Sequence, residues 1–82
     1  MDYYEKRKRA FTDIKTAINN DSAKDEYTDV KLLAFKILDK YGLSEKITIQ
    51  YIEKLITLGI VESKDTGKTI LVKYTDKAGR LL

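Results

Sequence analysis

The chain of 82 residues contains no cysteine and no histidine. Without cysteine it can have no disulfide, no thiolate nucleophile and no cysteine-bound metal. Without histidine it lacks the commonest general base and the commonest metal ligand. Only carboxylates remain for acid–base chemistry, and they are scattered singly along the sequence. We therefore expect no enzyme, no metal and no cofactor, and no small-molecule substrate is evident.

Proline is absent too, and so is any apolar run of the roughly 18 residues that a membrane span needs. No apolar stretch follows the basic run Lys6–Arg9, so we expect no secretory signal and a cytoplasmic protein.

The length fits one domain, residues 1–82, with a modest core and an incentive to dimerise. Few Asn, Gln and Met beside many Lys and Ile favour a thermophilic source, although an AT-rich genome gives the same bias.

The net charge of +3 is unevenly spread, because both ends of the chain are basic and the middle is slightly acidic. Such an asymmetry suits a polyanionic partner on one face. A lysine-rich surface that binds nothing would show the same pattern.

Apolar residues at a period of 3.6 predict three helices. The first is expected from Tyr3 to Ile18, within an N-terminal segment of residues 1–20, and Asn19-Asn20 would end it. A helix-turn-helix unit is expected over residues 28–58. In its first helix Thr28 would be the N-cap and Gly42 the C-terminal stop. The inward positions of that helix would be Val30, Leu33, Ala34, Ile37, Leu38 and Tyr41.

The third helix is expected from its N-cap Ser44 to Gly59, with Ile52, Leu55, Ile56 and one of Thr48 and Ile49 facing inward. The period then changes to two, which predicts a hairpin over residues 60–74 with its turn at Asp65-Thr66-Gly67-Lys68. A short helix would follow over residues 75–82. The expected fold class is therefore α+β.

Two of these stretches resemble the winged helix-turn-helix regulators, and small archaeal and archaeal-virus regulators are similar in size and composition. Residues 42–61 are similar to that family's pattern of a serine cap, a recognition helix and Leu-x-x-x-Gly-Ile-Val. Residues 74–82 resemble the Tyr-x-Leu-Thr-x-x-Gly-Arg signature that closes the wing in MarR-like and PadR-like repressors, without the usual Leu before the Thr and with one residue inserted or shifted. The resemblance implies a winged helix whose third helix enters the major groove of double-stranded DNA, in a transcriptional regulator.

On that basis seven residues are candidates for DNA contact. They are Lys46, Ile47, Gln50, Tyr51 and Lys54 on the third helix and Lys64 and Lys68 in the wing. A solvated helix face and lysines that protect an edge strand remain the alternatives. Ile47 is either an outward apolar group or core. Glu45 and Glu53 repel phosphate, which keeps open a second reading as a winged-helix protein-interaction module.

A homodimer is the expected assembly, since the first helix is long for so small a core. The residues expected at its interface are Tyr3, Tyr4, Phe11, Leu81 and Leu82. The alternative is that the stripe of apolar residues on the first helix belongs to the core.

Overall fold

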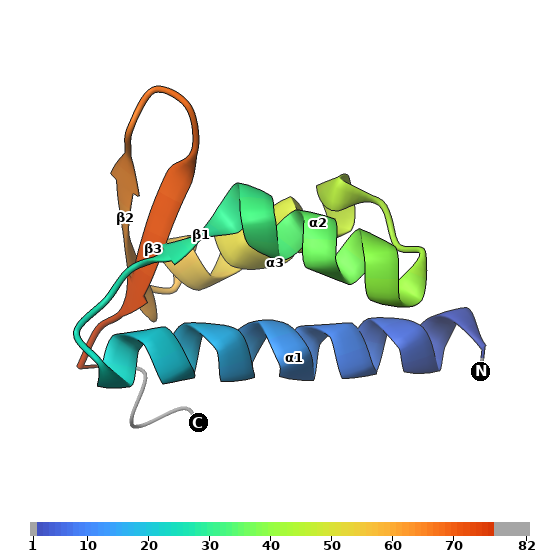
Figure 1. The fold of residues 1–82 in the computed structure, drawn as a ribbon. Helices are drawn as coiled ribbons and strands as arrows, with labels where there is room; N and C mark the ends of the chain where they lie inside the picture. Colours follow the sequence, from blue (N-terminus) through green and yellow to red (C-terminus); the bar gives the residue numbers. More distant parts are fainter. Residues whose placement is uncertain (1, 77–82) are drawn as a thin grey trace.

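The computed structural model describes residues 2–76 (Figure 1). It is an α+β fold of three helices and one three-stranded antiparallel sheet. In chain order the elements are α1 (Tyr3–Ala23), β1 (Thr28–Asp29), α2 (Val30–Tyr41), α3 (Glu45–Thr57), β2 (Val61–Asp65) and β3 (Ile70–Tyr74). The long α1 lies beneath α2 and α3, and the hairpin of β2 and β3 rises away from it (Figure 1).

Helix α1 begins at the cap Asp2, whose carboxylate accepts a hydrogen bond from the Glu5 amide at 2.8 Å. It continues to Ala23, so the expected end at Asn19-Asn20 is wrong. An asparagine permits a left-handed stop but does not impose one. The chain turns only at Asp25, whose φ is 61°.

The second helix begins one residue later than expected, because Asp29 rather than Thr28 is its N-cap. One oxygen of Asp29 accepts from the amides of Lys31 and Leu32 at 2.9 and 3.3 Å. Thr28 is buried, and its hydroxyl donates to Asp21 at 2.7 Å, which removes it from any capping role. Thr28 and Asp29 form β1, a strand that the sequence did not predict.

Helices α2 and α3 are joined by residues 42–44. Gly42 has a φ of 70°, a conformation in which glycine is unstrained, and it ends α2 as expected. Ser44 precedes α3 with extended backbone, but its side chain makes no capping bond. The tight turn brings the two helices against each other, so that α2 and α3 share one core.

The expected hairpin is present, with strands β2 at Val61–Asp65 and β3 at Ile70–Tyr74. Strand β3 is central: it pairs with β2 on one side and with β1 on the other, where Thr28 lies opposite Val72. Two bonds of Tyr74 tie β3 to α1. Its amide donates to the Ser22 hydroxyl at 3.0 Å and its phenol to the Lys15 carbonyl at 3.2 Å.

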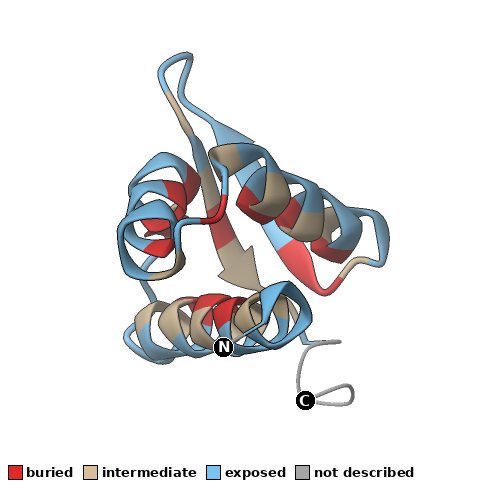
Figure 2. Cartoon of the chain, turned by 90° about the vertical axis from the view of Figure 1, so that its right-hand side faces the viewer, coloured by how far each residue is buried: buried red, intermediate tan, exposed pale blue. Residues whose placement is uncertain are grey.

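The core lies where α1, α2, α3 and the sheet meet (Figure 2). Its apolar members are Ala10, Ile14, Ile18, Val30, Leu33, Ala34, Ile37, Leu43, Ile52, Leu55, Ile60, Val61 and Val72. The expectation that Leu38 is inward is wrong, because it is 39% exposed. Thr48 rather than Ile49 is the inward residue of α3.

The expected short helix over residues 75–82 lies outside the described residues, apart from its first two positions. Within residues 2–76, no helix combines the length and the apolar character that a membrane crossing requires.

Candidate nucleic-acid interface

Helix α3 presents a polar strip to solvent because its opposite side is fixed in the core. Thr48, Ile52 and Leu55 are buried, and they recur at the spacings that define one face of a helix. The strip that this leaves exposed on the far side consists of Lys46, Gln50, Glu53 and Thr57. It carries one cation, one anion and two hydrogen-bonding groups.

The structure divides the five candidate residues of α3 into two sets. Lys46, Gln50 and Lys54 are exposed. Ile47 and Tyr51 are half-buried against the core, on the side of α3 that faces α1. The register expected from the sequence therefore holds for the polar candidates, whereas the two apolar ones pack within the chain.

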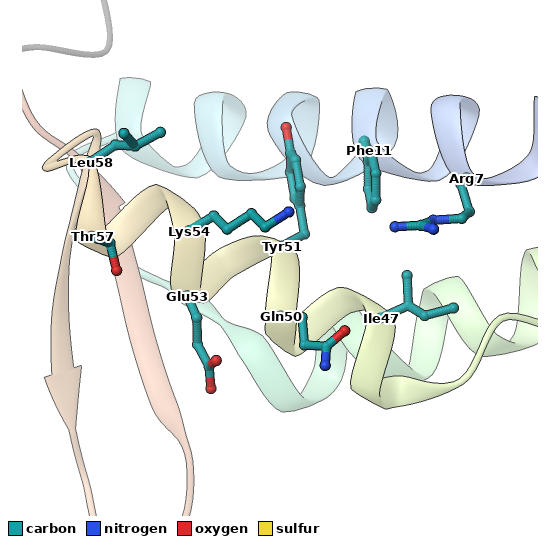
Figure 3. A pocket seen from close by; sticks show the side chains of 9 residues that line it. All are labelled: Arg7, Phe11, Ile47, Gln50, Tyr51, Glu53, Lys54, Thr57 and Leu58. Carbon is teal, nitrogen blue, oxygen red and sulfur yellow. The ribbon is translucent and has the colours of Figure 1, made fainter. Parts of the chain in front are cut away.

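A groove of about 800 Å³ runs between α1 and α3 (Figure 3). Phe11 from α1 and Tyr51 from α3 lie side by side in it, with ring centroids 4.1 Å apart and planes 6° apart. Burial raises the pKa of the Tyr51 phenol above its ordinary value of 10.0. The remaining lining residues are Arg7, Ile47, Gln50, Glu53, Lys54, Thr57 and Leu58.

Two cations flank the ring pair in this groove. The Arg7 guanidinium lies between two aromatic rings, 5.8 Å from the Tyr3 centroid and 5.4 Å from that of Phe11. Its Nε is buried and has no hydrogen-bond partner within residues 2–76. Lys54 reaches towards the rings from α3, while Glu53 points away from them (Figure 3). The charged residues that line the groove are therefore two cations and one anion, with the cations on the side of the aromatic rings.

The hairpin carries Lys64 and Lys68, both exposed. Its turn is well held: the Asp65 carboxylate accepts from the Gly67 amide at 2.8 Å, and the Thr66 amide donates to the Thr69 carbonyl at 3.0 Å. The Gly67 φ of 85° is the positive value expected for this turn. Lys68 therefore projects from a defined backbone rather than a loose loop.

A second hollow of about 300 Å³ joins the hairpin to the helices. Lys68 and Ile70 line it from the hairpin side, Lys31 from the start of α2, and Glu45 and Ile49 from the start of α3. Lys68 thus lies on the same side of the molecule as the first turns of α2 and α3. Of the seven candidate residues, all of which lie within residues 2–76, Lys68 alone lines this hollow.

The residues expected at the dimer interface differ in where the structure places them. Tyr3 and Tyr4 are exposed near the start of α1. Phe11 is half-buried against Tyr51 of the same chain. Leu81 and Leu82 lie outside the described residues. Arg7, which its place in the basic run Lys6–Arg9 and in the apolar stripe of α1 made a candidate for DNA-backbone or dimer contact, lines the α1–α3 groove.

No side-chain group in residues 2–76 gathers three or more possible metal ligands. Comparison with known proteins finds no matching family model, no matching curated protein and no matching solved structure.

Proposed function

We propose that this α+β fold is a winged helix that binds double-stranded DNA as a small transcriptional regulator. Helix α3 would enter the major groove and the hairpin would contact the backbone or the minor groove. The element order supports this, because a tight turn joins α2 to α3 and a hairpin follows α3 directly. The residues of this stretch also carry the resemblance to winged helix-turn-helix regulators.

The observation that carries the proposal is the polar strip of α3 between two groups of cations. On one side lie Arg7 and Lys54 in the α1–α3 groove, and on the other Lys31 and Lys68 near the hairpin. A helix in the major groove lies between two phosphate backbones, so cations on both flanks match the charge that it would meet. Gln50 lies on the strip, where its amide can pair with an adenine edge.

The experiment is a binding titration of fluorescent duplexes at about 50 mM salt, followed by selection of bound sequences from a random pool. Affinity should fall with salt at a slope of about −0.9 for each phosphate neutralised. Gln50→Ala should relax base preference at one position, costing about 1–3 kcal/mol there. Lys68→Ala should weaken all sequences alike and reduce the slope by about one.

Lys36→Ala provides the matched control, because Lys36 is an exposed cation of α2 that lines neither hollow. It should leave the salt slope unchanged within about 0.3, since it is expected to neutralise no phosphate. A wild-type chain that binds no duplex at low salt would contradict the proposal.

A second candidate function is a winged-helix protein-interaction module. It is favoured by Glu53, which places a phosphate-repelling charge in the middle of the exposed strip, and by the modest net charge of +3. The titration separates the two functions, because a protein-interaction module has no salt-dependent affinity for duplex DNA.

A further inference from the structure

Helix α2 carries an apolar face that nothing in residues 2–76 covers. Leu32, Phe35 and Leu38 are 60%, 50% and 39% exposed. They recur every three residues, with Phe35 opposite to the buried residues Val30 and Leu33 and with Leu32 and Leu38 on either side of it. Three large apolar side chains on one 12-residue helix form a patch rather than scattered exposure.

Two opposite charges lie on the same face. Lys31 and Asp39 are exposed, and each is four residues from Phe35, so the three form one row along the helix. Neither is in an ion pair within the described residues, where the ion pairs are Lys40–Asp13 and Lys73–Asp25. The row therefore has a cation at one end, an aromatic ring in the middle and an anion at the other end.

This row is complementary to itself when it is reversed. We propose that a second copy of the chain packs on this face, with the two α2 helices antiparallel about a twofold axis at Phe35. The axis places Phe35 against Phe35 of the second copy and Lys31 against its Asp39. A twofold interface requires this reciprocity, in which residue i meets j and j meets i.

Known helix packing accommodates the arrangement. When the rows of residues spaced by four pack alongside each other, the helices cross at about −50°, the commonest class in globular proteins. Leu32 and Leu38 then lie on either side of the central row and cover the ring of the facing Phe35. The pairing buries the three exposed apolar side chains of each copy and gives each charge a partner.

The exposed apolar face of α2 is a better site for a second copy than the apolar stripe of α1. The apolar stripe of α1 is used within the chain: Ala10, Ile14 and Ile18 are core, and Phe11 stacks on Tyr51. Figure 2 shows α2 and α3 on opposite sides of the molecule above α1. Pairing through α2 leaves the polar strip of α3 open but engages Lys31, one of the four cations that flank the strip, so the dimer is tested by its mass and not by DNA binding.

Sedimentation equilibrium of the full chain at concentrations up to about 1 mM, where weak interfaces of small area are populated, tests the proposal. We expect a mass of twice the 9.5 kDa chain at the highest concentration. Phe35→Ser and Leu32→Ser should each weaken the association at least tenfold. Leu58→Ser is the matched control, because Leu58 is also 60% exposed and lies outside the face; it should leave the association unchanged.

Charge reversal tests the antiparallel register. Lys31→Asp and Asp39→Lys should each weaken association, because like charges then meet, and the double variant should restore it to within about threefold of the wild type. A wild-type chain whose mass stays at 9.5 kDa at every concentration would overturn the proposal. The apolar face of α2 would then be a candidate site for another protein. A dimer that survives Phe35→Ser and Leu32→Ser, or a double variant that fails to restore association, would also overturn it.

Discussion

The rings of Phe11 and Tyr51 stack nearly parallel, 4.1 Å apart, and this contact connects the middle of α1 to the middle of α3. The contact fixes the side of α3 that faces α1. It thereby determines which α3 side chains remain exposed, because Tyr51 cannot rotate outward without losing its partner.

We expect this pair to stabilise the fold beyond the apolar area that each ring buries. Phe11→Leu and Tyr51→Leu should each lower the free energy of unfolding, and a double-mutant cycle should give a coupling of about 0.5–1.5 kcal/mol. Urea unfolding of the four proteins measures it. Additive effects of the two substitutions would show that the stacking contributes nothing of its own.

The buried hydroxyl of Thr48 is expected to lower the free energy of unfolding. Its side chain is fully buried in α3, and its hydroxyl has no hydrogen-bond partner in the described part of the chain. Thr48→Val keeps the shape of the side chain and removes the unpaired group, so the free energy of unfolding should rise by about 1 kcal/mol. Thr57→Val, at an exposed position of the same helix, should change it by less than about 0.5 kcal/mol. A destabilised Thr48→Val protein would mean that the hydroxyl has a partner.

The Asp13 carboxylate is expected to make the free energy of unfolding depend on pH in the acid range. One of its oxygens accepts from Lys40 at 2.8 Å and from Tyr41 at 2.6 Å, and these bonds hold the pKa of the carboxyl below its ordinary value of 3.8. A carboxyl whose pKa is lower in the folded chain contributes fully above about pH 5, and its contribution is lost as the pH falls through the folded pKa. Asp13→Asn should therefore cost stability at neutral pH and much less near pH 2. The difference between the two urea midpoints, measured across this range, should shrink as the pH falls; a constant difference would contradict the linkage.

Asp29 is expected to stabilise both α2 and the hairpin. Its carboxylate caps α2 and also accepts a hydrogen bond from the Thr69 hydroxyl at 2.7 Å, which lowers the pKa of Asp29. Asp29→Ala should lower the free energy of unfolding by about 1–2 kcal/mol through loss of the cap. Thr69→Val removes only the second bond and should cost less. Thermal unfolding of both variants tests the order, and an equal loss would show that the cap adds little.

The sequence predicted the elements that have a period and a stop signal. Helices α2 and α3 follow an apolar period of 3.6 and end near Gly42 and Gly59, and the hairpin follows a period of two around Gly67. Strand β1 was missed because two residues carry no period. Its position depends instead on a hydrogen bond between Thr28 and Asp21 and on pairing with β3.

The candidate interface was predictable in part for a similar reason. Lys46 and Gln50 are exposed because the core of α3 fixes the side opposite to them. Ile47 and Tyr51 turn towards the core because α1 lies beside them, and the position of α1 is a tertiary contact that no local pattern encodes. Leu38 follows the inward period of α2, yet α1, α3 and the sheet leave it partly uncovered.

The central position of β3 has a consequence for the order of folding. Its pairing with β2 joins neighbouring segments, whereas its pairing with β1 joins Thr28 to Val72, which are separated by about half of the chain. Closing that long loop costs chain entropy that only the surrounding core can offset. The hairpin and the α2–α3 pair can therefore assemble early from local contacts, and the closure of β1 onto β3, with α1 beside it, completes the domain late.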